Sequence, residues 1–258
     1  MIIAIDIGNT NTKIAICHQS TIMHHCILST CYKRTTYEYF ILLNAFTNQK
    51  NIKLQHIKYV VISSVVPNIN PVIENMCKQH LQVDPIFITN ESISNLDITI
   101  NLDQNSIGND RIADLVAAQK LWPNQDLLVI GMGTVTVFNL LDKHGSLYGQ
   151  IITPGIPCLT QSIRSQTALL PQVNLQKTNK LISKSTAESI GSGLYWGYVT
   201  MTEGIIKQIF NEEKKNFLII ATGGGSNLFY NNKNIHIIDT LLTIKGILYL
   251  HNNITSQH

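Results

Sequence analysis

Two segments of the chain repeat one local pattern: an apolar strand, a glycine turn and a second strand. The first is Ile2–Cys17 and the second is Leu127–Leu141. Their turns begin at Asp6 and at Gly131, and these corresponding places lie 125 residues apart, close to half of the 258-residue chain. The repeat predicts two similar halves whose hairpins face each other across a cleft. Because glycine turns after strands are common, a chance similarity is the alternative explanation.

Strand-like and helix-like segments alternate along the rest of the chain. Short β-branched or apolar runs predict strands, and apolar residues at helical spacing predict helices. The further predicted strands are Tyr59–Val65, Pro85–Thr89 and Phe217–Ala221, and the predicted helices are Tyr37–Phe46, Asn68–His80, Asp110–Leu121, Ser185–Phe210 and Gly246–Asn253. This alternation indicates an α/β protein in layers.

Composition and charge exclude several classes of protein. A net charge of +3 without a basic cluster argues against nucleic-acid binding. The longest apolar stretch, Leu127–Leu141, is too short and too rich in glycine for a membrane helix, and Asp6 interrupts the N-terminal apolar run of a possible signal sequence. The five cysteines form no CxxC pair, which favours reduced thiols and a cytoplasmic location over a disulfide framework or a zinc site.

The first turn, from Asp6 to Lys13, carries the sharpest chemical signal. A glycine at position 8 lets backbone N–H groups approach a phosphate closely. An acid at a strand end can hold Mg²⁺ through water, and Lys13 could add positive charge. The structural alternative is an Asn-rich hairpin turn in which Asp6 accepts turn hydrogen bonds.

The tetrapeptide Gly108–Arg111 places a carboxylate and a guanidinium at a predicted helix start. Asp110 could take a proton from an attacking hydroxyl, and Arg111 could bind a carboxylate or a phosphate. A capping aspartate with a solvated arginine is the structural alternative, which the spacing alone favours.

A third glycine turn, Thr222–Ser226, follows a predicted strand and is another place where backbone can meet a ligand. No Gly-Lys-Ser or Gly-Lys-Thr follows, so it is not a P-loop, and it does not fit the dinucleotide motif GxGxxG. The chain also has no GxSxG elbow, which disfavours an α/β-hydrolase.

Taken together and in order, these motifs resemble those of the type III pantothenate kinases, in the acetate and sugar kinase, heat-shock 70 and actin superfamily. The resemblance extends from Met1 to about Gly246. Its elements are Asp6–Thr10, Ser63–Pro67, Gly108–Arg111, Gly133-Thr134, Pro154-Gly155, Thr167–Pro171, Ser185-Thr186, Ser192-Gly193 and Thr222–Gly224. Each motif alone is weak, but the ordered set covers almost the whole chain.

The resemblance implies two ribonuclease-H-like domains, which we expect at residues 1–116 and 117–258, with ATP in the cleft between them. It implies ATP-dependent phosphorylation of pantothenate, the first step to coenzyme A, by a cytoplasmic homodimer that binds neither membrane nor nucleic acid. The residues implied at the phosphates and Mg²⁺ are Asp6, Ile7, Gly8, Asn9, Thr10, Asn11, Thr12 and Lys13, with Thr134, Gly223 and Gly224 at ATP from the second half. Those implied at pantothenate are Gly108, Asn109, Asp110 as the base, Arg111, and Thr186 across a dimer interface.

The chain departs from the family pattern around the second half's phosphate motif. Gly131 replaces an aspartate that usually helps to hold a monovalent cation such as K⁺ or NH₄⁺, and Asn139 replaces a further acid. Near the substrate side, Asn101 and Gln104 stand in the places of a tyrosine and a proline, and Gly149-Gln150 in that of a glycine pair. We therefore expect a kinase with an altered cation requirement.

Two other functions are compatible with the sequence. The eroded second motif would suit a weak or inactive relative that acts as a regulatory or accessory binding protein. The changes at Asn101 and Gln104 would suit a kinase for another small acid or sugar.

Overall fold

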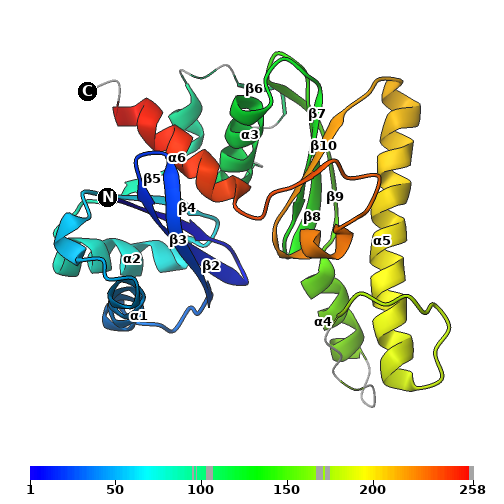
Figure 1. Cartoon of the computed structure of the whole chain (residues 1–258), viewed down its shortest axis with the longest axis horizontal. Helices are drawn as coiled ribbons and strands as arrows, with labels where there is room; N and C mark the ends of the chain where they lie inside the picture. The colour runs from blue at the N-terminus through cyan, green and yellow to red at the C-terminus, as the bar shows by residue number, and fades with distance from the viewer. Residues whose placement is uncertain (95, 97, 103–106, 167–170, 172–174, 256–258) are drawn as a thin grey trace. The chain divides into compact units, whose positions relative to one another are not determined.

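A computed structural model describes residues 1–94, 96, 98–102, 107–166, 171 and 175–255 of the chain. The chain forms two compact units, one built from Met1–Ile98, Asp103–Leu121 and Leu242–His258, the other from Thr99–Leu102 and Trp122–Leu241. Each unit contains one mixed β-sheet (Figure 1). None of the helices in the described ranges is long and apolar enough to cross a membrane.

The sheet of the first unit has the strand order β3-β2-β1-β4-β5. The strands are β1 (Ile2–Ile7), β2 (Asn11–His18), β3 (Thr21–Ser29), β4 (Tyr59–Ser64) and β5 (Ile86–Phe87). β1 is antiparallel to β2 and parallel to β4. Its run of isoleucines favours a buried strand, since β-branched side chains fit a pleated surface.

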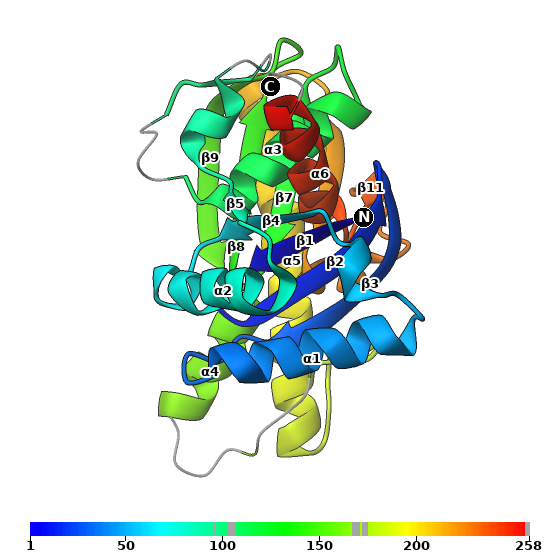
Figure 2. The ribbon, with the colours of Figure 1, turned by 90° about the vertical axis from the view of Figure 1, so that its left-hand side faces the viewer.

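Helices cover both faces of this sheet. On one face lie α1 (Thr36–Gln49) and α2 (Asn70–Met76), whose apolar side chains join Ile3, Ile5 and Ile7 in one core (Figure 2). On the other face, α3 (Asn109–Leu121) and α6 (Leu242–Thr255) pack on each other and on β4. α1 begins with a capping box between Thr35 and Glu38, which satisfies backbone donors at its first turn.

The second unit repeats the arrangement. Its sheet has the order β11-β10-β7-β8-β9-β6. The elements are β6 (Thr99–Ile100), β7 (Leu127–Met132), β8 (Val135–Leu141), β9 (Ser146–Pro154), α4 (Ile156–Gln166), α5 (Thr186–Glu213), β10 (Leu218–Thr222) and β11 (Ile237–Ile238). α5 packs on this sheet through apolar residues such as Tyr195, Tyr198 and Ile206.

The order of β9-β8-β7-β10-β11 corresponds strand by strand to that of β3-β2-β1-β4-β5. β7 is antiparallel to β8 and parallel to β10, as β1 is to β2 and β4. The predicted repeat is therefore confirmed as two units of the same topology, and both predicted hairpins form. Short helical turns complete the chain at η1 (Leu54–His56), η2 (Pro67–Ile69), η3 (Cys77–Leu81), η4 (Asn90–Ile93) and η6 (Gly224–Phe229).

The compact units do not follow the expected ranges 1–116 and 117–258. α3 stays whole in the first unit through Leu121, and α6 returns to that unit from the far end of the chain. The reason is the packing of α6 on α3, where the two backbones approach closely at Gly246 and Ala113.

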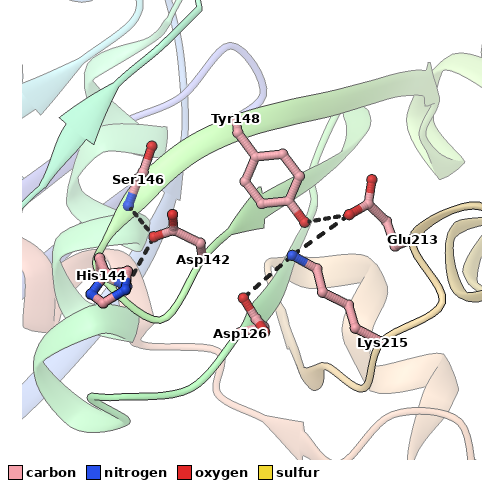
Figure 3. A network of polar contacts seen from close by, with 7 residues as sticks. All are labelled: Asp126, Asp142, His144, Ser146, Tyr148, Glu213 and Lys215. Carbon is pink, nitrogen blue, oxygen red and sulfur yellow. Dashed lines mark hydrogen bonds and ion pairs between the residues drawn. The ribbon is translucent and has the colours of Figure 1, made fainter.

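A network of polar contacts ties the edge of the second unit together (Figure 3). The Lys215 ammonium lies 3.4 Å from the carboxylate of Asp126, 3.6 Å from that of Glu213 and 4.5 Å from the ring centre of Tyr148. The Tyr148 hydroxyl donates to Glu213 Oε2 at 3.0 Å. In the adjoining hairpin, Asp142 Oδ1 accepts from the backbone N–H groups of residues 144 and 146. These contacts hold the hairpin β8–β9 and the end of α5 together.

Candidate active site

The end of β1 carries the first carboxylate of the candidate site. Asp6 pairs with Lys13 on β2 and with Ser63 on β4. Paired residues on neighbouring strands project to the same face of a sheet, so these three side chains share the face that α3 and α6 cover. The isoleucines that alternate with Asp6 point to the opposite, apolar core.

The turn between β1 and β2 is held by hydrogen bonds from Thr30, the residue that follows β3. Thr30 Oγ1 donates to the carbonyl of Gly8 at 2.7 Å and lies 2.9 Å from Thr12 Oγ1, while the Thr30 N–H donates to Thr10 O at 2.9 Å. The Gly8 N–H closes the turn on Asn11 O at 3.0 Å. Residues 9 to 11 stay exposed. Thr30 thus fixes the backbone of the turn, while the residues at its tip are exposed to solvent.

The start of α3 brings the second carboxylate. Asp110 Oδ1 accepts from the backbone N–H of Arg111 at 2.8 Å, and Asn109 Nδ2 donates to Ser64 O at 3.1 Å. A Cβ at position 108 would lie 2.6 Å from Asp110 Oδ1, so glycine there leaves room for the carboxylate. Asp110 lies within the helix rather than at its cap, and the structural alternative of a capping aspartate does not describe it.

A third carboxylate, Asp114, lies one turn further along α3. It is only 7% exposed, and its Oδ1 accepts from the hydroxyl of Thr243 on α6 at 2.7 Å. Asp6, Asp110 and Asp114 therefore form an acidic cluster at one end of the first sheet, and the positive charges next to it are those of Lys13 and Arg111.

Burial and like charge raise the pKa values of this acidic cluster. Burial, and next the charge of Asp110, raise the pKa of Asp6 to about 7, although Lys13 opposes the change. Burial also raises the pKa of Asp110, against the hydrogen bond and charge of Arg111, and raises the pKa of Asp114 well above its ordinary value. A carboxyl with a raised pKa is a better proton acceptor once ionised.

The residues present fit a divalent cation at Asp6. Asp6 Oδ1 is buried and has no hydrogen-bond partner among the residues that the structure describes. The same is true of the hydroxyl of Ser63, its neighbour in the sheet. A buried carboxylate oxygen without a partner is costly, and a hard cation or its bound water would satisfy it. Within the described ranges, no group of three acidic, histidine or cysteine side chains forms a ready cage. The donor set therefore suits Mg²⁺ held partly by water and by phosphate oxygens.

The second unit has a matching turn. The Gly133 N–H donates to Val135 O at 3.0 Å and closes the turn, and the Gly155 N–H donates to Thr134 O at 3.1 Å. Gly223, at the end of β10, adopts a φ of 85°, and a Cβ there would lie 2.6 Å from Met132 O. The strand ends at Met132 and Thr222 thus meet through glycine backbone, and a side chain at position 223 would prevent this close approach.

Gly131 and Asn139, two positions singled out in the sequence, both lie in the sheet of the second unit. Gly131 sits in β7 opposite Thr222 and has no side chain to bind a cation. Asn139 is buried, and its Nδ2 donates to Val129 O at 3.3 Å across the strand pair. Within the described part of the chain, Thr222 Oγ1 is buried without a hydrogen-bond partner, in the place that Ser63 occupies in the first unit.

Two remaining predicted residues, Thr186 and Asn101, belong to other segments of the second unit. Thr186 is the first residue of α5, exposed, next to Ser185, which caps the helix. Asn101 Nδ2 donates to Ser146 Oγ at 2.7 Å. Gln104 and Thr167–Leu170, also singled out in the sequence, are outside the described residues.

Sequence reasoning missed three residues that shape the first-unit site. Thr30 holds the β1–β2 turn, and nothing in its sequence context marks it. Asp114 follows Asp110 by four residues, a spacing that puts both side chains on one helix face and could have identified it. Thr243, its partner, comes from α6, some 130 residues away.

Comparison with known proteins identifies the family. A family model described as type III pantothenate kinase matches residues 2–208. A type III pantothenate kinase of Anaplasma marginale (strain St. Maries) is 48% identical over 97% of this chain and 98% of its own length. One of Ehrlichia canis (strain Jake) is 46% identical over 100% of this chain and 98% of its own.

Solved structures support the fold at much lower identity. A protein of Sinorhizobium meliloti described as a 2-dehydro-3-deoxygalactonokinase has a TM-score of 0.61 at 11% identity, covering 98% of this chain and 96% of its own. Component A of (R)-2-hydroxyglutaryl-CoA dehydratase from Acidaminococcus fermentans has a TM-score of 0.53 at 11% identity, and the match covers 100% of this chain and 99% of that protein. The expected fold, two duplicated ribonuclease-H-like domains of the actin-like ATPase type, is confirmed. With an acidic strand-end turn, the Gly108–Arg111 helix start and near full-length relatives, the chain belongs to the type III pantothenate kinase family.

Proposed function

We propose that this kinase transfers the γ-phosphoryl group of ATP to the hydroxyl of pantothenate, giving 4′-phosphopantothenate and ADP in the first step of coenzyme A synthesis. Family membership and the names of its relatives support this reaction. The observation that carries it is the acidic cluster, which places a partly buried carboxyl with a raised pKa, Asp110, at a helix start near Asp6.

Asp110 is assigned as the general base. Its carboxylate takes the proton of the substrate hydroxyl as that oxygen bonds to the γ-phosphorus, and the bond between the γ-phosphorus and the bridging oxygen breaks to release ADP. Arg111 and the adjoining backbone would bind the pantothenate carboxylate, for which a guanidinium is well suited. The expected substrate contacts are Gly108, Asn109, Asp110, Arg111 and Thr186.

The turn residues from Asp6 to Lys13 are assigned to the phosphates of ATP, and Thr134, Gly223 and Gly224 to the rest of the nucleotide. Lys13 would bring positive charge to the phosphates. Asp6 would hold Mg²⁺ through water, and a bound Mg²⁺ would neutralise charge on the phosphates during transfer. The buried Oδ1 of Asp6, which has no hydrogen-bond partner in the described ranges, supports this assignment.

The proposed enzyme has a reduced requirement for a monovalent cation. Gly131 offers no side-chain oxygen where the family has an aspartate, and Asn139 is engaged with Val129. Because an oxygen ligand is missing, we expect activity without K⁺ or NH₄⁺ to be a large fraction of that with either.

A cation series tests the reaction. Purified protein is incubated with ATP, Mg²⁺ and pantothenate in K⁺, NH₄⁺, Na⁺ or neither, and ADP and 4′-phosphopantothenate are quantified. Asp110→Asn is expected to lower kcat by about 10²- to 10⁴-fold, because the base is lost. Asp84→Asn, at a carboxylate that is 90% exposed, is the matched control and should keep parental activity. Folded parent protein that makes no product with any cation would refute the reaction, and full activity in Asp110→Asn would refute the base.

We further propose that the chain works as a cytoplasmic homodimer. Leu181 and Ile182, a few residues before Thr186, are 64% and 88% exposed, which is unusual for adjacent large apolar residues. All five cysteines are free thiols, as is typical of reducing compartments. Light scattering should report twice the chain mass, and Ile182→Asp should shift it toward the monomer. Fractionation of cells that contain the tagged chain would place it.

The regulatory alternative has less support. It rested on the changes at Gly131 and Asn139, but the acidic cluster, Lys13 and Arg111 are retained in the first unit. Nucleotide binding without product formation would favour it.

A further inference from the structure

Asp114 is a buried carboxyl to which the proposed reaction assigns no role. It lies four residues after Asp110 on α3, so both side chains lie on one face of the helix, one above the other. It is 7% exposed, and its Oδ1 accepts a hydrogen bond from the Thr243 hydroxyl at 2.7 Å. A carboxyl this buried calls for a specific partner, and Thr243 supplies one.

The Asp114–Thr243 hydrogen bond joins two helices. Thr243 belongs to the first turn of α6, and α6 packs along α3 on the first unit's sheet. The contact is close, since a Cβ at Gly246 would overlap the backbone of Ala113, the residue before Asp114. The first turns of α6 therefore contact α3 about one helical turn from Asp110.

We propose that Asp114 is a positioning residue: its hydrogen bond with Thr243 anchors α3 to α6 and thereby holds Asp110 in place for the proton transfer. The inference rests on the proposed function, since it presumes that Asp110 is the base. Small displacements of a reacting group lower the rate steeply, so an anchor one turn away affects catalysis without touching the substrate.

The electrostatic surroundings indicate that Asp114 acts as a hydrogen-bonding group rather than as a charge. Burial first, and the negative charges nearby, raise its pKa well above the ordinary value. The charged groups that face it are Asp6 and Lys13 from the first hairpin and Asp110 and Arg111 from its own helix. An asparagine, neutral and of the same shape, can therefore replace it with its Oδ1 still accepting from Thr243.

Paired substitutions test the anchor. Thr243→Val and Asp114→Leu remove the hydrogen bond and should lower kcat roughly 10- to 100-fold with little change in KM for ATP. Thr243→Ser and Asp114→Asn keep it and should stay near the parent. Thr255→Val is the matched control, because that hydroxyl donates to the carbonyls of His251 and Asn252 in its own helix. If Asp114→Leu fails to fold, the Thr243 pair decides alone.

Two further readouts separate positioning from other roles. In Asp114→Asn, the acid limb of the pH profile of kcat/KM should stay where it is in the parent, whereas a shift to lower pH would show that charge carries the effect and would overturn the proposal. Full activity in Thr243→Val would also overturn it.

Hydrogen exchange keeps the test independent of the reaction. Without substrates, the backbone amides of residues 112–118 should exchange faster in Thr243→Val than in Thr255→Val. This result can be obtained even if the parent makes no 4′-phosphopantothenate, in which case the reaction fails while the anchor stands. Equal exchange in both variants would refute the anchor.

Discussion

The close approach of α6 to α3 makes a quantitative prediction about Gly246. A Cβ added there would lie 2.8 Å from Ala113 Cα and closer still to the Ala113 carbonyl. Since ordinary contacts between carbon atoms are about 3.5–4.0 Å, one helix backbone must move by roughly 1 Å or more. Overpacking of this kind costs about 1–3 kcal/mol, and sometimes more when backbone must move. We therefore expect Gly246→Ala to lower the free energy of unfolding by about 2 kcal/mol.

Gly204 gives a matched control inside another helix. A Cβ there meets nothing within 4 Å. Because alanine is preferred to glycine in a helix by about 0.5–1 kcal/mol, Gly204→Ala should raise the free energy of unfolding by that amount. The same substitution is thus predicted to have opposite signs at two helical glycines, with a difference of about 3 kcal/mol.

Urea unfolding followed by two probes can measure this difference. Both tryptophans, Trp122 and Trp196, belong to the second unit, so their fluorescence reports on that unit, and far-ultraviolet circular dichroism reports on both. Gly246→Ala should shift the circular dichroism transition to lower urea, and Gly204→Ala should shift the fluorescence transition to higher urea. A Gly246→Ala protein as stable as the parent would refute the claim that the two helices meet through bare backbone.

Three other perturbations have defined outcomes. The raised pKa of Asp6 means that its ionisation opposes folding: the stability that Asp6 contributes is complete below pH 4 and is lost as the pH rises through about 7. In thermal melts without metal, Asp6→Asn should therefore be more stable than the parent at pH 8 but not at pH 4. Added Mg²⁺ should raise the melting temperature of the parent but not that of Asp6→Asn. Thr30→Val removes the hydrogen bond to Gly8 and should lower stability by about 1–2 kcal/mol and raise KM for ATP, whereas an unchanged KM would show that the turn does not bind phosphate. Lys215→Met keeps an apolar side chain next to the Tyr148 ring but loses the positive charge over that ring and two partly exposed ion pairs. Urea unfolding should show a change of no more than about 1 kcal/mol, and a larger loss would mean that the network of Figure 3 acts cooperatively.

The sequence predicted the core of each unit well. The β-branched run at Ile2–Ile7 and the apolar run that opens the second hairpin are strong local signals, and both form central strands. The helix expected over Ser185–Phe210 forms as α5, from Thr186 to Glu213. Hydrophobic periodicity over a long segment leaves few alternatives.

The elements that sequence reasoning missed lack such signals. β3 forms an edge and carries His24 and His25 between partly exposed apolar residues, so its alternation is weak. β9 contains Gly149 and ends at Pro154, residues that ordinarily disfavour a strand. α6 was expected only from Gly246 but begins at Leu242. In each case contacts with a neighbouring strand or helix supply the stability that the segment's own sequence does not show.

The candidate site shows the same division. Asp6 and Asp110 could be singled out because turn and helix-start motifs mark them. Their electrostatic coupling, and the addition of Asp114 and Thr243, depend on helices that meet only in the folded unit. Contacts between residues so distant in sequence leave no local pattern to find.

The interrupted first unit has a consequence for the order of events during synthesis. The stretch from Trp122 to Leu241 is nearly a complete unit as soon as it leaves the ribosome, whereas the N-terminal unit lacks α6 until residues 242–255 emerge. The half of the protein that is made first is therefore the last to be finished, and the carboxylates of its candidate site stay without their covering helix until then. Loss of a short C-terminal segment would damage the site farthest from it along the chain and leave the neighbouring unit intact.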